Sequence, residues 1–128
     1  MTATTHTIDL LTLVNVTILI VDDNAAMRGA IKSTVCSDDD TIIERADGSE
    51  ALKAYTQHRP DYVLMDIRMK QTDGITATAQ IHAFDPGAKV IMVSDFGTPS
   101  FRHAAEKAGA IGFVLKEQLP DLRRLLGR

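Results

Sequence analysis

The chain has 128 residues, of which 45% are hydrophobic and 24% charged, and its formal net charge is -3 at pH 7. This length is enough for one domain with a core that needs no disulfide or structural metal. The small negative charge offers no field to attract phosphate backbones, so we expect no direct nucleic-acid binding by this chain. The single cysteine, Cys36, excludes an internal disulfide and fits a reducing compartment.

Residues 1–16 are predicted to form an extension that precedes a single domain at residues 17–128. The extension has no Lys or Arg near its start, and Asp9, Thr12 and Asn15 interrupt its apolar residues, which argues against a signal peptide. No stretch of the sequence is long and apolar enough to span a membrane, so we predict a cytoplasmic protein. The extension is still too apolar for a plain solvated tail. Either an additional helical turn on the domain or a contact with another chain would bury its leucines.

Short apolar runs alternate with helical stretches from residue 17 onward, which is the pattern of an α/β fold with a mainly parallel sheet. In chain order, the sequence predicts a strand at 17–21, a helix at 24–36, a strand at 41–45, a helix at 48–58, a strand at 61–65, a helix at 75–84, a strand at 89–93, a helix at 99–108, a strand at 110–115 and a helix at 119–126.

Two local features carry further expectations. The acidic turn at residues 38–40 is expected to be a solvated loop. The last helix is expected to bury Leu122 together with either Leu125 or Leu126, because these leucines recur at helical spacing.

Polar residues of a shared chemical character follow four of the five predicted strands. Asp22 and Asp23 follow the first, Asp66 the third, Ser94 the fourth and Lys116 the fifth. Because the carboxyl ends of parallel strands lie at one edge of a sheet, these side chains should converge there. Neighbouring carboxylates repel one another, and Mg²⁺, which prefers oxygen ligands, would relieve that repulsion. One carboxylate could then attack phosphorus while the metal and the ammonium neutralise the transferred group.

Five segments in this order, ILIVDDNAAMR, DYVLMDIRM, QTDG, VIMVSD and AGAIGFVLKE, resemble the receiver domain of two-component response regulators. The resemblance covers about residues 17–126. It implies the flavodoxin-like fold of the chemotaxis regulator, a doubly wound five-stranded parallel sheet of order 2-1-3-4-5 with five helices. The last segment is most similar to receivers that are usually joined to helix-turn-helix output domains.

The resemblance implies a role for each residue at a strand end. Asp66 would accept a phosphoryl group from a histidine kinase or a phosphotransfer protein. Lys116 would pair with the phosphoryl oxygens, and Ser94 would move in to donate a hydrogen bond to one of them. Phe113 matches an aromatic switch position and would turn inward in the active state. A Mg²⁺ ion would be held by Asp66 and three further groups, namely Asp22, Asp23 and the main-chain carbonyl of Arg68.

Asp95 departs from the family pattern, in which Ala or Gly commonly follows the switch hydroxyl. A carboxylate that turns inward at this position would raise the barrier to an incoming anionic phosphodonor. Arg68 and Lys70 on the neighbouring loop could neutralise it. We hypothesise that Asp95 and Arg68 pair across the mouth of the site and tune phosphorylation or the lifetime of the phosphoryl group.

Three classes of function compete at this point. The first is a signalling switch that is phosphorylated on Asp66 and then changes its affinity for partners, without acting as a metabolic enzyme. The second is a degenerate receiver, a protein-interaction module that works without phosphorylation because Asp95 blocks the site. The third is a Mg²⁺-dependent phosphatase, which usually has an acid two residues after its nucleophile, where this chain has Arg68.

The resemblance also implies a surface for a partner or for a homodimer. It would be formed by the helix at 99–108, the strand at 110–115 and the helix at 119–126. The candidate residues on the two helices are Phe101, Arg102, His103, Arg123 and Arg124.

Overall fold

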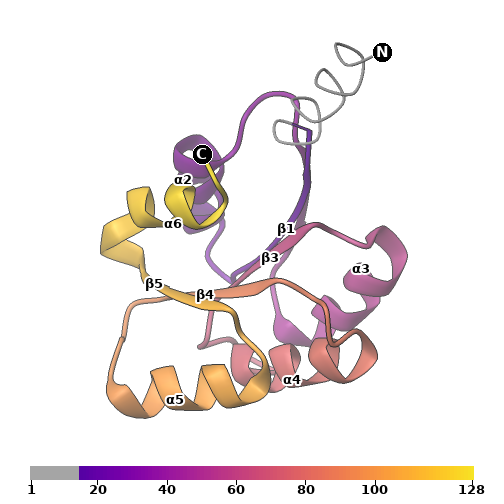
Figure 1. The fold of residues 1–128 in the computed structure, drawn as a ribbon, viewed down its shortest axis with the longest axis vertical. Coiled ribbons are helices and arrows are strands. Elements are labelled where there is room, and N and C mark those ends of the chain that lie inside the picture. The colour runs from indigo at the N-terminus through magenta and orange to yellow at the C-terminus, as the bar shows by residue number, and fades with distance from the viewer. Residues whose placement is uncertain (1–14) are drawn as a thin grey trace, which may run out of the picture.

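The structure, a computed structural model, describes residues 15–128, which fold into alternating strands and helices around one parallel sheet (Figure 1). The five strands of this part of the chain run side by side in the order β2-β1-β3-β4-β5, as predicted. The strands are β1 (Thr17–Val21), β2 (Thr41–Arg45), β3 (Tyr62–Met65), β4 (Val90–Ser94) and β5 (Gly112–Leu115). The helices are α2 (Ala25–Val35), α3 (Ala51–His58), α4 (Gly74–Phe84), α5 (Pro99–Ala108) and α6 (Leu119–Leu125), with short 3₁₀ turns at Gly48–Glu50 and Lys116–Gln118.

The element boundaries lie close to those predicted, and capping residues explain most of them. Asn24 is the N-cap of α2, and its side chain accepts a hydrogen bond from the Met27 amide. Two elements start later than predicted. Helix α3 begins at Ala51, after the 3₁₀ turn at Gly48–Glu50, instead of residue 48, and β5 begins at Gly112 instead of residue 110. The Ala110 amide still donates to the carbonyl of Ala105, so the turn that closes α5 extends into the predicted strand.

The sheet is buried on both faces, as its apolar strands require. Figure 1 shows α2 and α6 on one face and α3, α4 and α5 on the other. Each face has its own core. The first packs Ile31 and Val35 of α2, Leu119 and Leu122 of α6 and Leu126 directly after it against β1, β3, β4 and β5. The second packs the small residues Ala51, Ala54, Ala77 and Ala105 of the other three helices against the opposite face.

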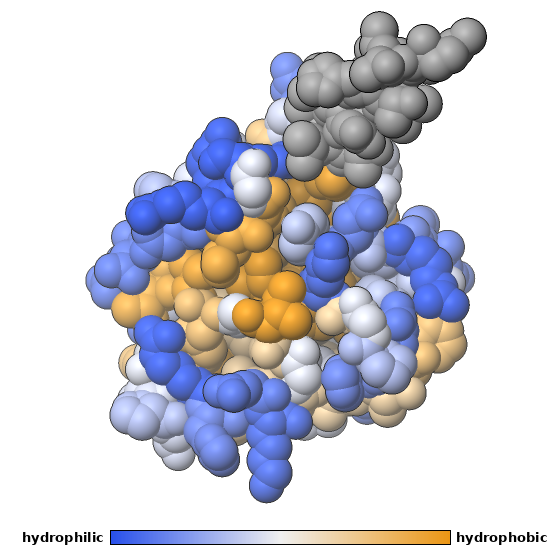
Figure 2. All heavy atoms as spheres, in the orientation of Figure 1, coloured by the Kyte–Doolittle hydropathy of each residue, from blue (hydrophilic) through white to orange (hydrophobic). Residues whose placement is uncertain are grey.

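The structure shows which of the two leucines at the end of the last helix is buried together with Leu122. Leu122 and Leu126 are buried, whereas Leu125 remains 48% exposed. An apolar area of surface is visible between α5 and α6, over the edge of the sheet (Figure 2). Ile111, just before β5, is also exposed at 59%. No helix within residues 15–128 is long and apolar enough to cross a membrane.

The acidic turn at residues 38–40 is not uniformly solvated, so that expectation was wrong for Asp40. The Asp40 side chain has no exposed surface and forms an ion pair with Arg128, with Nη2 2.7 Å from Oδ1. Its carboxylate also accepts hydrogen bonds from the amides of Val16 and Ser37. Burial alone would raise the pKa of Asp40, but the hydrogen bonds from Arg128 and from the two amides outweigh burial and lower it.

The Asp40→Asn substitution should therefore reduce the free energy of unfolding by about 2 kcal/mol at neutral pH, because it leaves the buried Arg128 guanidinium without its counter-charge. A carboxylate with a lowered folded-state pKa stabilises the fold above its usual pKa of 3.8, and this stabilisation is lost as the pH falls through the folded-state value. The difference between wild type and variant should shrink in urea unfolding below about pH 4. Asp38→Asn, at an exposed position of the same turn, is the matched control and should change stability by less than about 0.5 kcal/mol. An equal loss in both variants would contradict the assigned ion pair.

Candidate functional site

The polar residues that follow the strands converge at the carboxyl edge of the sheet, as predicted. Register explains the placement: Val21 of β1 lies beside Met65 of β3, so Asp22 and Asp66 follow at the same level. Backbone hydrogen bonds continue this ladder, since the Asp66 amide donates to the Val21 carbonyl. Asp22, Asp66 and Ser94 are almost completely buried, at 1%, 6% and 3% exposure.

Lys116 supplies the positive charge of this edge. Its Nζ lies 3.0 Å from Asp22 Oδ2 and 3.2 Å from Asp66 Oδ1, and its side chain is only 10% exposed. Burial would lower the pKa of Lys116, but the two carboxylates outweigh burial and raise it. The ammonium therefore stays charged and holds both acids.

The pKa of the Asp66 carboxyl is higher than usual. Burial, followed by the neighbouring Asp22 carboxylate, raises its pKa to about 6. Lys116 and a hydrogen bond from the Ile67 amide to Oδ1, 2.9 Å long, oppose this rise. Burial and the Asp22 charge together outweigh the single ammonium, and a bound cation would favour the ionised form of Asp66.

The three carboxylates form a group that suits a hard cation. Asp22, Asp23 and Asp66 each present one oxygen, and these oxygens lie within 4.8 Å of one another. Asp22 Oδ1 accepts a hydrogen bond from the Asn24 amide, whereas Oδ2 is buried and receives no hydrogen bond from residues 15–128, only the ionic contact with Lys116. Asp23 is exposed, so a bound cation would keep water ligands. An all-oxygen, partly hydrated site of this kind fits Mg²⁺.

Ser94 lies at the same edge, but its hydroxyl is engaged elsewhere. Its Oγ accepts a hydrogen bond of 3.1 Å from the Phe96 amide, which ties it to the loop between β4 and α5. Thr98 then caps α5 and Pro99 begins it.

The expected pair between Asp95 and Arg68 is not formed in the described part of the chain, and that hypothesis was wrong in its geometry. The Arg68 guanidinium lies over the ring of Phe96, 4.4 Å from its centroid, and 5.9 Å from the centroid of Phe101. A planar guanidinium stacks well on aromatic faces, which accounts for its position. The Asp95 carboxylate lies instead 4.0 Å from Lys116 Nζ, while 65% of its side chain stays exposed.

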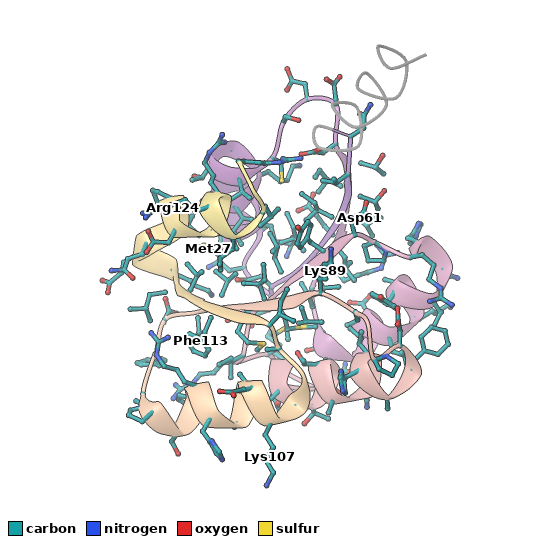
Figure 3. All side chains as sticks on the ribbon, in the orientation of Figure 1. Met27, Asp61, Lys89, Lys107, Phe113 and Arg124 are labelled. Carbon is teal, nitrogen blue, oxygen red and sulfur yellow. The ribbon has the colours of Figure 1, made fainter. Side chains whose placement is uncertain are left out.

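Phe113 lies in β5 on the side that faces α5 (Figure 3). Its ring is half-buried, and the Arg102 guanidinium covers it at 4.6 Å from the ring centroid. The same arginine donates a hydrogen bond from Nε to the Gly97 carbonyl. Arg102 therefore connects the aromatic side chain to the loop that follows Ser94.

Two residues that shape the site were not recognised from sequence. Asp47 accepts hydrogen bonds from the amides of Gln71 and Thr72 and fixes the loop between β3 and α4. Gly74 starts α4 so close to Asp66 that a Cβ there would lie 1.8 Å from the Asp66 carbonyl oxygen. The Asp-Gly pair at 73–74 belongs to the QTDG segment of the resemblance, but nothing in that segment indicates this contact.

Comparison with known proteins agrees with the fold. The family model of the response regulator receiver domain matches residues 18–126. The chemotaxis protein CheY of Listeria monocytogenes is 46% identical over 100 residues, which cover 77% of this chain and 84% of the relative. The chain therefore belongs to the response regulator receiver family. This places it among the signalling domains of two-component systems and not among metabolic enzymes.

Two solved structures illustrate the range of similar receivers. The crystal structure of a LuxR-family two-component response regulator from Aurantimonas has a TM-score of 0.77 and 28% identity and covers 88% of this chain and 86% of its own. The CheX-CheY-BeF3-Mg complex from Borrelia burgdorferi has a TM-score of 0.74 and 30% identity, covering 88% and 87%. Both the chemotaxis type and the type found in LuxR-family regulators are thus represented.

Proposed function

We propose that the chain accepts a phosphoryl group on Asp66 from a histidine kinase or a phosphotransfer protein, in a Mg²⁺-dependent reaction that switches its affinity for partners. The observation that carries this proposal is the position of the Asp66 carboxylate. It is buried at the sheet edge within 3.2 Å of the Lys116 ammonium and within the group of three acids. The Borrelia relative was solved with BeF3 and Mg, which supports the same chemistry here.

The chemistry follows from the hydrogen bonds of Asp66. Oδ1 contacts both Lys116 and the Ile67 amide, whereas no hydrogen bond from residues 15–128 reaches Oδ2. Oδ2 would form the new bond to phosphorus as the bond from phosphorus to the donor's leaving atom breaks, and the leaving group would retain that electron pair. Lys116 would neutralise the phosphoryl oxygens.

Mg²⁺ would be held by Asp22, Asp23, Asp66 and the main-chain carbonyl of Arg68, and when bound it would supply positive charge against the phosphoryl oxygens. Ser94 would leave the Phe96 amide and donate its hydroxyl hydrogen to a phosphoryl oxygen. Phe113 would then change its position beneath Arg102. Through these movements, the conformation of the surface around α5 and β5 would depend on whether Asp66 is phosphorylated.

The surface formed by α5, β5 and α6 would serve as the partner or homodimer surface of a cytoplasmic protein. The apolar area in Figure 2 lies here. Ile111, just before β5, and Leu125 of α6 are exposed apolar side chains at these elements. Exposed apolar area flanked by charged residues is typical of protein contact sites. The exposed basic residues are Arg102, His103 and Lys107 on α5 and Arg123 and Arg124 on α6.

Intact-mass measurement after incubation with acetyl phosphate tests the proposed function. We expect a single phosphate adduct that requires Mg²⁺ and is absent from Asp66→Asn, because the amide lacks a nucleophilic carboxylate. Asp61→Asn is a matched control at an exposed position away from the acidic group, and it should take up phosphate like the wild type. If the wild type binds Mg²⁺ but forms no adduct, the proposal fails and the phosphorylation-independent module becomes the better account.

A further inference from the structure

Three consecutive residues of the loop between β4 and α5 are each held by a cation from outside the loop. The cations come from the β3–α4 loop, from α5 and from the end of β5, so the loop is anchored on several sides. The three contacts join Asp95 Oδ2 to Lys116 Nζ at 4.0 Å, the Phe96 ring to the Arg68 guanidinium at 4.4 Å and the Gly97 carbonyl to Arg102 Nε at 3.0 Å.

The stack of Arg68 on Phe96 is the contact that spans the mouth of the site. Phe96 is 45% exposed, so burial alone would hold its ring weakly. The Arg68 guanidinium supplies the missing attraction, and the Phe101 ring of α5 also lies near it, with its centroid 5.9 Å away. Through this stack the loop that follows the phosphoacceptor is connected to the loop that follows Ser94.

Phe96 is engaged through its backbone as well as through its ring. Its amide donates to the Ser94 hydroxyl, so a displacement of Ser94 toward Asp66 would strain or break this hydrogen bond. Asp95, directly before it, faces Lys116. A phosphoryl group on Asp66 would place additional negative charge beside Lys116 and repel the Asp95 carboxylate. Phosphorylation would therefore require movement on both sides of Phe96.

We infer that Arg68 is a positioning residue whose stack on Phe96 latches residues 95–97 in the unphosphorylated arrangement, with Asp95 beside Lys116, and that phosphorylation opens this latch. The inference rests on the proposed function of Asp66. A hollow of about 610 Å³ adjoins the stack, lined by Arg68, Phe101 and neighbouring residues of the β3–α4 loop and α4. It gives the released Arg68 side chain room to move.

Phe96→Leu is the most direct test, because it keeps an apolar side chain at an exposed position and removes only the ring. Phosphoryl uptake from acetyl phosphate with Mg²⁺ should become about two- to fivefold faster, the size expected for one exposed cation–π contact. In the ¹H–¹⁵N NMR spectrum of the unphosphorylated variant, the Gly97 amide should shift toward its position in the wild-type complex with beryllium fluoride and Mg²⁺. A merely structural role of Phe96 would lower stability without either change.

Two arginine variants and a lysine variant distinguish the effect of losing the stack on Phe96 from the effect of losing a positive charge. Arg68→Ala and Lys70→Ala each remove one positive charge from the same loop, so Arg68→Ala should take up phosphate faster than Lys70→Ala. Arg59→Ala breaks a comparable stack on Phe84, 4.8 Å from the ring centroid and away from the site, and should leave the rate unchanged. Uptake by the wild type, with an unchanged rate and Gly97 amide in Phe96→Leu, would overturn the latch alone. An absence of uptake by the wild type would overturn the proposed function itself.

Discussion

Gly74→Ala should destabilise the domain by about 3 kcal/mol or more, as measured by urea unfolding. An added Cβ would lie 1.8 Å from the carbonyl oxygen of Asp66 and 2.8 Å from its carbonyl carbon. Both are backbone atoms of a buried residue, so no side-chain rotation can relieve the overlap. The Gly74 amide also donates a 2.7 Å hydrogen bond to the Ile67 carbonyl, which holds the start of α4 against the end of β3.

Gly29→Ala is the matched control for this variant. Gly29 lies on the exposed face of α2, and a Cβ there would meet nothing within 4 Å. In a helix interior, alanine is favoured over glycine by about 0.5–1 kcal/mol, so this variant should gain stability. A Gly74→Ala protein within about 1 kcal/mol of the wild type would contradict the close approach of α4 to the phosphoacceptor backbone.

Lys116→Met should have opposite effects on metal binding and on phosphorylation. The ammonium lies 3.0 Å and 3.2 Å from two of the three acids that would hold Mg²⁺, so its removal should raise the affinity for Mg²⁺ on the order of tenfold. The same change deletes the group that would neutralise the phosphoryl oxygens. Phosphoryl uptake should therefore fall by about a hundredfold or more, as it does when one oxyanion-stabilising donor is lost.

Calorimetric titration with Mg²⁺ and intact mass after acetyl phosphate treatment measure these two effects. Lys89→Met is the matched control, since Lys89 lies at the other end of the sheet with its ammonium 5.4 Å from the centroid of the Tyr62 ring (Figure 3). It should leave both quantities unchanged. Weaker Mg²⁺ binding in Lys116→Met, or uptake at the wild-type rate, would contradict the assigned position of the ammonium.

The convergence of the acids, Ser94 and Lys116 was predictable from the apolar runs and from the polar residue that follows each run. The strand order was predictable from the resemblance to the receiver family. The position of Arg68 was not. A charge on one loop was expected to meet the opposite charge on the next, but the ring of Phe96 offered a planar partner that spacing in sequence does not indicate. Electrostatic pairing between loops is decided by tertiary packing.

The misreading of Asp40 has a similar cause. A run of three acids predicts a solvated turn from composition alone, yet the partner that buries Asp40 is Arg128, 88 residues away. The choice between Leu125 and Leu126 depended on where the last turn of α6 ends, which periodicity does not decide. The predictions for residues 1–14 lie outside the described part of the chain.

Chemical localisation of the phosphoryl group tests the central claim most directly. Borohydride reduces an aspartyl phosphate to homoserine, so the phosphorylated protein can be reduced, digested and sequenced by mass spectrometry. We predict homoserine at position 66, dependent on both Mg²⁺ and acetyl phosphate, with Asp22 and Asp23 unmodified. Homoserine at another aspartate, or none at position 66 in a protein that carries the adduct, would contradict the assignment of Asp66 as phosphoacceptor.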